Sequence, residues 1–209
     1  MDLQFYGANV LTITTKEARV TIDDNLLELG GKGVIRDGDV VLYTQQEHSK
    51  PKAKTTLIVD GPGEYEVNDV NILALAMRAH TDEEKEHTAT LYKIEAEDLS
   101  VVVTGHIFPE VSNSQIELLG TVDVLCIPVG NRGYTLDGVA ALELIKRIEP
   151  KMVIPTHYAD DVLKYPVAQQ TLEEALKSLA MEVKETVSKL KVKANDLSDI
   201  TELVILEKQ

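Results

Sequence analysis

The order of short apolar runs along the chain constrains its fold more than any other feature. In the first two-thirds, runs rich in β-branched and aromatic residues alternate with turn residues such as Gly30-Gly31, Asp37-Gly38 and Asn68-Asp69. The pattern predicts strands at residues 3–6, 10–14, 19–22, 40–44, 56–60, 65–67, 70–76, 89–95 and 100–105. This succession of strands without intervening helices favours an antiparallel meander.

After residue 120 the pattern changes to alternating strands and helices. It predicts a strand at 122–129, a helix at 136–147, a strand at 152–155, a helix at 168–181 and final strands within 184–193 and at 203–206. Leu142, Ile145 and Ile148 share one face of the first helix, and Pro150 ends it just before the next strand. The later part therefore predicts αβ units, and the whole chain an α/β fold.

Length and charge limit the classes of protein and partner. With 209 residues, 44% of them hydrophobic, the chain can bury a substantial core, and we expect one domain over residues 1–209. The formal net charge of -14 would repel phosphate backbones and anionic membrane surfaces. We therefore expect neither nucleic acid nor a membrane as a partner.

Cys126 is the only cysteine, and the apolar run around it predicts a buried, reduced thiol. The first residues lack a basic segment followed by an apolar one, and no stretch of about 18 apolar residues occurs. These observations predict a cytoplasmic protein.

Histidines are the strongest candidates for chemistry. Of the five, His48, His106 and His157 each follow closely on a predicted strand. Strand ends that face one way are where α/β proteins gather functional side chains. Because neutral imidazole is a good zinc ligand, these positions suggest a metal site, although any one histidine alone is more often an ordinary polar residue.

Four segments resemble those of a known family. They read Gly-Pro-Gly-Glu-Tyr-Glu-Val at 61–67, Val-Asp-Val-Leu-Cys-Ile-Pro-Val-Gly at 122–130, Thr-Leu-Asp at 135–137 and Ile-Pro-Thr-His-Tyr at 154–158. In this order they resemble small bacterial members of the metallo-β-lactamase superfamily that are similar to ascorbate-phosphate lactonase-like hydrolases. The resemblance implies a four-layer αββα sandwich of two mixed β-sheets flanked by helices, with metals at one edge.

The metal-binding motif of that family is degenerate here. The motif is His-x-His-x-Asp-His, and the alignment places Gln46, His48, Lys50 and Pro51 at its four ligand positions. Only His48 can ligate a metal as the family does, because proline offers no ligand and an ammonium repels a second cation.

Further along the chain, the resemblance assigns the remaining ligand positions. His157 matches the closing histidine, His106 stands where the family has a bridging aspartate, and His80 lies near the third histidine, with His87 as a competing assignment. A two-metal site is therefore not expected, because the carboxylates that would bridge two metals are absent. A single zinc or similar divalent metal held by His48, His80, His106 and His157 remains one hypothesis.

Two functions follow from these residues. In the first, the chain is a metal-dependent hydrolase of a small-molecule substrate, with a metal-bound water as nucleophile and Glu47, Asp82 or Asp160 as candidate bases. In the second, the fold has lost its catalytic site, holds no metal and serves as a binding or interaction protein, with a homo-oligomer as one form. The sequence does not decide between them.

Overall fold

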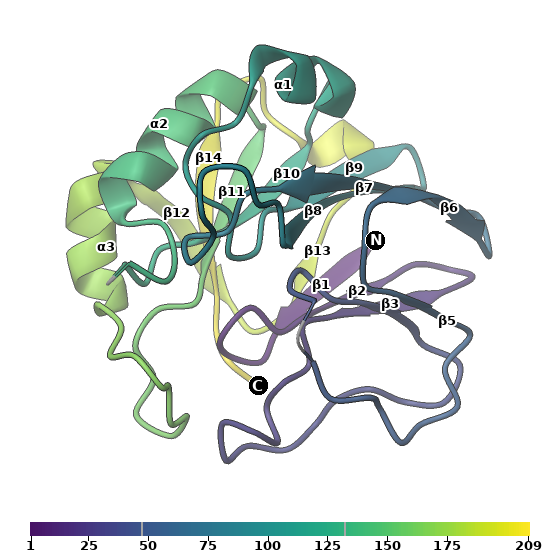
Figure 1. Cartoon of the computed structure of the whole chain (residues 1–209). Coiled ribbons are helices and arrows are strands. Elements are labelled where there is room, and N and C mark those ends of the chain that lie inside the picture. The colour runs from purple at the N-terminus through teal and green to yellow at the C-terminus, as the bar shows by residue number, and fades with distance from the viewer. Residues whose placement is uncertain (47, 132) are drawn as a thin grey trace.

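Two mixed β-sheets packed face to face form the protein, which we describe from a computed structural model that places residues 1–46, 48–131 and 133–209 (Figure 1). The six-stranded sheet has the order β13-β1-β2-β3-β4-β5, and the eight-stranded sheet the order β12-β14-β11-β10-β9-β8-β7-β6. The six-stranded sheet contains β1 (Asp2–Phe5), β2 (Leu11–Thr14), β3 (Arg19–Ile22), β4 (Val40–Leu42), β5 (Leu57–Val59) and β13 (Leu190–Lys191). The eight-stranded sheet contains β6 (Gly63–Val67), β7 (Val70–Met77), β8 (Ala89–Ala96), β9 (Leu99–Val103), β10 (Val124–Pro128), β11 (Met152–Thr156), β12 (Val183–Val187) and β14 (Glu202–Leu206).

The predicted strands are confirmed, but the antiparallel meander is only partly right. The hairpin turn Asn68-Asp69 joins β6 to β7, and both of its residues have positive φ (48° and 56°), as a type I′ turn requires. In contrast, β3, β4 and β5 pair in parallel. The connections after β3 and β4 are long enough to carry the chain back to the starting edge, which a short hairpin turn cannot do.

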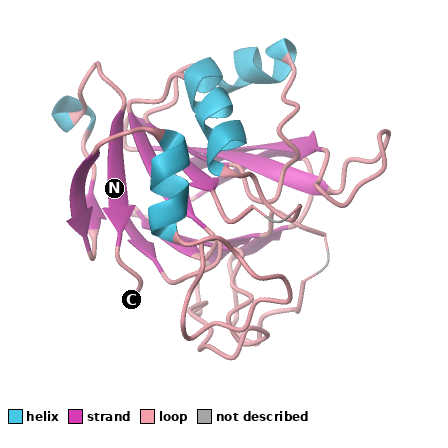
Figure 2. Cartoon of the chain, turned by 90° about the vertical axis from the view of Figure 1, so that its left-hand side faces the viewer, coloured by secondary structure: helices cyan, strands magenta, loops and turns pink. Residues whose placement is uncertain are grey.

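The three α-helices are α1 (Asn113–Leu119), α2 (Gly138–Ile148) and α3 (Leu172–Leu179), and a short 3₁₀ helix η1 spans Ala194–Asp196. Apolar residues of α2 and α3 pack on the outer face of the eight-stranded sheet, and Figure 2 shows the longer helices in front of the strands, with a short helical segment apart from them at the left. Over the outer face of the six-stranded sheet, Arg19 binds Asp39 and the carbonyl of Val34, so a loop covers that face. Among the described residues, no helix is long and apolar enough to cross a membrane.

The core between the sheets holds the inward-facing side chains of both, including Phe5, Ile13, Leu42 and Ile94. Cys126 belongs to this core and is 1% exposed, which confirms the predicted buried thiol, and burial raises its pKa to about 12. A thiol in this state is protonated and unreactive at neutral pH.

Tyr92 links the two sheets through the core. It lies in β8, is fully buried, and its hydroxyl donates to the carbonyls of Tyr43 (2.8 Å) and Val59 (3.1 Å) beside β4 and β5. We expect Tyr92→Phe to lower the free energy of unfolding by about 1–3 kcal/mol, because the Tyr43 carbonyl would lose this buried donor. Urea unfolding measures the change, and an unaltered midpoint would contradict the assigned role.

The candidate site lies at the edge where neighbouring parallel strands end. Strands β9, β10 and β11 run in parallel and end at the same edge, where His106 and His157 follow β9 and β11. Asp23 and Thr44, which follow β3 and β4 of the other sheet, lie beside them, since an added Cβ at Gly105 would stand 2.3 Å from Thr44 Cβ. Left-handed backbone conformations concentrate here, at Ala8, Asp23, Gly105, Asn131 and His157. Such conformations often mark functional sites.

Candidate functional site

His106 and His157 lie against each other at this edge. Their ring centroids are 4.8 Å apart and the rings meet edge to face. The two residues are 3% and 2% exposed. His157 adopts φ 51°, and its backbone N–H donates to the carbonyl of Ala8 (2.7 Å), which ties the end of β11 to the loop between β1 and β2.

An amide side chain joins His106 to the rest of the edge. Asn9 Nδ2 lies 3.2 Å from His106 Nδ1, and Thr156 Oγ1 donates to Asn9 Oδ1 (3.0 Å). With the amide nitrogen as donor, Nδ1 of His106 is the acceptor and the ring proton sits on Nε2. That Nε2 is buried and has no hydrogen-bond partner among the described residues. Asn9 thereby connects the six-stranded sheet to two strand ends of the eight-stranded sheet.

His157 is held by a second amide and covered by aromatic rings. Its Nδ1 lies 3.2 Å from Gln169 Oε1. The ring of Tyr134 stands 4.7 Å from His106 and 5.8 Å from His157, and that of Tyr165 stands 5.1 Å from His157. The pair is therefore enclosed by amides and phenols.

Burial keeps both imidazoles neutral. It lowers the pKa of His157 to about 4. It also lowers the pKa of His106 well below the ordinary value, and the neighbouring His157 and His80 add to this effect. At neutral pH the pair is uncharged, a form that can ligate metals or exchange hydrogen bonds.

The other two predicted ligands lie differently. His48 stacks on Tyr43, with ring centroids 3.6 Å apart, and its Nε2 contacts Asp60 at 3.3 Å. His80 is joined to His106 through the backbone, its N–H donating to the His106 carbonyl (3.4 Å), while its ring packs edge-on against Phe108. The structure thus brings His106 and His157 together and turns His48 toward the end of β5.

The residues predicted at the motif's four ligand positions do not gather at the edge. Gln46 is exposed, whereas the side chain of Gln45 hydrogen-bonds Tyr134 at the edge. Lys50 is exposed and lines a separate cavity beside Tyr43, and His87 is exposed in its loop.

Two of the three candidate bases, Asp82 and Asp160, are hydrogen-bonded within their own loops. The third, Glu47, lies outside the described residues. Asp82 Oδ2 accepts from the backbone N–H groups of Ala79 (2.7 Å) and Thr88 (2.8 Å) and shapes its loop. Asp160 accepts from the N–H groups of Val162 and Leu163 and pairs with Lys208 at 2.5 Å. Hydrogen bonds and the lysine hold the pKa of Asp160 below its usual value although burial opposes them, so it is a poor base.

Asp23 is a buried carboxyl group at the edge that the sequence patterns did not predict. Asp23 is 7% exposed and accepts from the N–H (2.6 Å) and hydroxyl (2.5 Å) of Thr44. Burial raises its pKa to about 6, although both hydrogen bonds from Thr44 lower it. An aspartate directly after the apolar strand residue Ile22 was the available signal, since strand ends at this edge collect polar groups.

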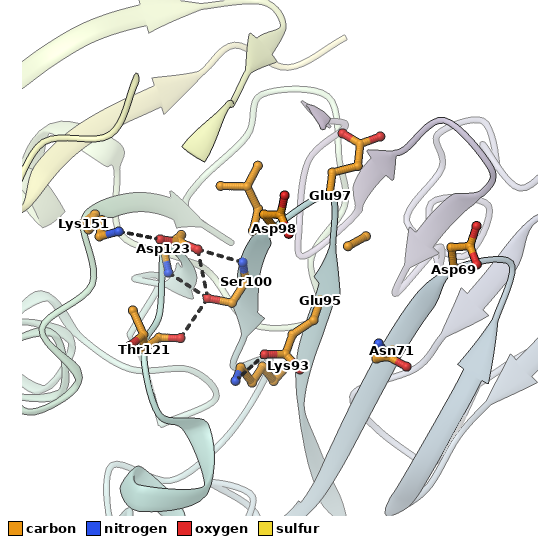
Figure 3. A pocket seen from close by; sticks show the side chains of 12 residues that line it. Asp69, Asn71, Lys93, Glu95, Glu97, Asp98, Ser100, Thr121, Asp123 and Lys151 are labelled. Atoms are coloured by element: carbon orange, nitrogen blue, oxygen red, sulfur yellow. Dashed lines mark hydrogen bonds and ion pairs between the residues drawn. The ribbon is translucent and has the colours of Figure 1, made fainter. Parts of the chain in front are cut away.

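A hollow of about 740 Å³ lies at the starts of β9, β10 and β11, at the end of these strands away from His106 and His157 (Figure 3). Both of its lysines are in ion pairs: Lys151 binds Asp123 (2.9 Å), and Lys93 binds Glu95 (2.7 Å). Asp123 also accepts from the N–H of Ser100 (2.9 Å). These contacts fix the strand starts, and we do not place the functional site there.

A sequence model of a protein family, described as the beta-lactamase superfamily domain, matches residues 2–157 of this chain. This chain belongs to the metallo-β-lactamase superfamily. The same fold occurs in a Thermotoga maritima protein, provisionally named a Zn-dependent hydrolase of the superfamily, with TM-score 0.76, 21% identity and 99% of both chains covered. It also occurs in a provisionally named metal-dependent hydrolase of Parabacteroides distasonis, with TM-score 0.68, 17% identity and 99% and 93% covered. No curated protein matches the sequence.

An isothiocyanate hydrolase from Delia radicum gut bacteria shares the fold at greater distance, with TM-score 0.61, 14% identity, and 86% of this chain and 92% of that chain covered. At these identities the likeness establishes the metallo-β-lactamase fold and its two mixed sheets. What this chain does must be argued from its own residues.

The donor groups at the edge do not fit the metal centre that the superfamily implies. Among residues 1–46, 48–131 and 133–209, no three or more His, Cys, Asp or Glu side chains gather so that they could hold a metal ion. The four predicted histidines are not assembled, because His48 faces Asp60 and His80 faces Phe108. The groups in contact with the remaining pair are amides and phenols, and the nearby Asp23 carboxyl group is bound by Thr44, whereas a metal site requires further imidazole or carboxylate ligands.

Proposed function

We propose that this chain is a non-hydrolytic member of the metallo-β-lactamase superfamily that acts as a binding protein. The observation that carries the proposal is the closed His106–His157 pair, which is 3% and 2% exposed beneath Tyr134. Hydrolysis in this family needs a water-accessible centre at this edge. Here the chain's own side chains fill it.

The hydrogen bonds of the pair support the same conclusion. The amides of Asn9 and Gln169 engage Nδ1 of His106 and of His157, and the hydroxyl of Thr156 completes the network. These contacts join the loop between β1 and β2 to the ends of β9 and β11. The edge is therefore held by protein contacts that replace a shared metal as the connection between the sheets.

One observation favours the competing hypothesis of a one-metal hydrolase. Nε2 of His106 and Nδ1 of His80 are buried without hydrogen-bond partners among the residues described. A buried nitrogen without a partner costs stability, and a metal ligated by Nε2 would remove that cost. Metal content separates the two functions.

The test measures metal in protein purified without added zinc, for the wild type and for His106→Ala and His157→Ala. His87→Ala serves as the matched control, because His87 is exposed. We expect far less than one metal ion per wild-type chain and no change of melting temperature with a chelator. One metal ion per chain that is lost in both edge variants and kept in the control would refute the proposal.

A further inference from the structure

A cavity of about 470 Å³ lies next to the closed edge, between the loop after β3 and the loop after β4. We call it the loop cavity. Its apolar lining comes from Leu27, Ile35, Tyr43, Pro51 and Ala53. Its size falls within the range of small-molecule sites, and a mostly apolar lining with a few polar groups is typical of them.

One wall of the loop cavity carries oxygen acceptors. Asp24 Oδ2 accepts from the N–H groups of Val34 (2.5 Å) and Ile35 (2.8 Å), which fixes the carboxylate in place. Its Oδ1, like Asn25 Oδ1, is buried and has no hydrogen-bond partner within the described chain. Glu28 adds a second carboxylate, which accepts from the hydroxyl of Ser49. The carboxylates of Asp24 and Glu28 give this part of the lining negative charge, which favours a cationic group on a ligand.

The electrostatics of this wall are negative. Burial raises the pKa of Tyr43 to about 12, and the carboxylates of Asp24, Asp23 and Glu28 add to the shift in that order. The field that disfavours a phenolate at Tyr43 favours a cation at the same place.

The loop after β4 contributes positive charge to the lining. Lys50 and Lys52, both exposed, line the cavity from this loop. The ion pairs of the described chain involve neither lysine, although the chain as a whole carries a net charge of -14. Two lysines without acidic partners at a cavity favour an anionic group on the ligand.

We infer that the loop cavity binds a small zwitterion with an apolar body, of the size of an apolar amino acid or dipeptide. Its ammonium faces Asp24 and Glu28, its carboxylate faces Lys50 and Lys52, and its side chains lie on the apolar lining. A simple cation would meet the lysines and a simple anion the carboxylates, so charge complementarity selects a ligand with both. The inference rests on the proposed binding function and names its ligand class.

Calorimetric titration with L-leucyl-L-leucine tests the inference, with two blocked ligands beside it. N-acetyl-leucyl-leucine lacks the ammonium, and leucyl-leucine amide lacks the carboxylate. We expect saturable binding of the free dipeptide and about tenfold or greater weakening for each blocked form, because each loses charge-assisted hydrogen bonds. Equal affinity for all three ligands, or no saturable binding of the dipeptide, would overturn the inference.

Variants locate the site. Asp24→Asn keeps an oxygen that can accept from Val34 and Ile35 while removing the charge, and Lys50→Gln with Lys52→Gln removes the opposite charge. Lys54→Gln is the matched control, because Lys54 belongs to the same loop without lining the cavity. Both lining variants should bind at least about tenfold more weakly, with the control unchanged. Unchanged affinity in the lining variants overturns the site, whereas metal in the purified protein would refute the non-hydrolytic proposal without removing dipeptide binding.

Discussion

Replacing Gly105 with alanine is expected to lower the free energy of unfolding by about 2–4 kcal/mol. Gly105 has φ 61°, where a residue with a Cβ costs about 1 kcal/mol. The new Cβ would also stand 2.3 Å from both Cβ and Oγ1 of Thr44, so the two strand ends must separate, at an overpacking cost of about 1–3 kcal/mol. Separation would disturb the hydrogen bonds of Thr44 to Asp23 and shift His106.

The matched control for this variant is Gly38→Ala. Gly38 also has a positive φ of 87°, yet nothing lies within 4 Å of an added Cβ there. Its free energy of unfolding should fall by only about 1 kcal/mol, so the comparison separates the cost of the backbone conformation from that of the steric clash. Urea unfolding of both variants supplies the comparison. Equal losses would mean that β4 and β9 do not approach each other as closely at this edge as the structure shows.

Most strands could be predicted because each has a strongly patterned sequence. Arg19–Ile22 was predicted with its observed bounds, and β8 and β11 to within one residue. The parallel pairing of β3, β4 and β5 could not be predicted, because the relative direction of two strands depends on the path of the long loop that connects them. Helix α1 was missed since it has only seven residues, although Ser112 and Gln115 form a capping box that signals its start.

The candidate site was predictable where strands position the side chain directly. His106 and His157 follow β9 and β11 closely, and parallel pairing through β10 brings their strand ends to one edge. His48 sits in a long loop, so its direction depends on contacts with Tyr43 and Asp60 that no local pattern encodes. Asn9 and Gln169 were missed for the same reason, because their importance lies in partners distant along the chain.

Two residues in the loops at the edge, Gln45 and Ala8, help to close it. In the loop after β4, Gln45, next to the predicted ligand position Gln46, hydrogen-bonds Tyr134, whose ring lies against both histidines. In the loop between β1 and β2, Ala8 has φ 48°, and its carbonyl accepts from the His157 N–H. Both residues therefore take part in closing the edge.

Acidification is expected to destabilise the protein through this pair. In the unfolded chain a histidine has a pKa near 6.5, whereas burial lowers that of folded His157 to about 4. The unfolded state therefore binds the proton more readily, so stability is complete above pH 6.5 and falls as pH drops toward 4. His157 alone should account for a loss of about 2 kcal/mol between pH 7 and pH 5, and His106 acts in the same direction.

Asp23 has the opposite effect on stability as the pH falls, so variants are needed to separate its contribution from that of His157. Its folded pKa of about 6 lies above the ordinary 3.8, and protonation on acidification therefore stabilises the folded state, by about 1 kcal/mol between pH 7 and pH 5. Urea unfolding at pH 7, 6 and 5 should show a flatter profile for His157→Gln than for the wild type, and a steeper one for Asp23→Asn. Parallel profiles for the wild type and His157→Gln would mean that His157 is not held neutral by burial at this edge.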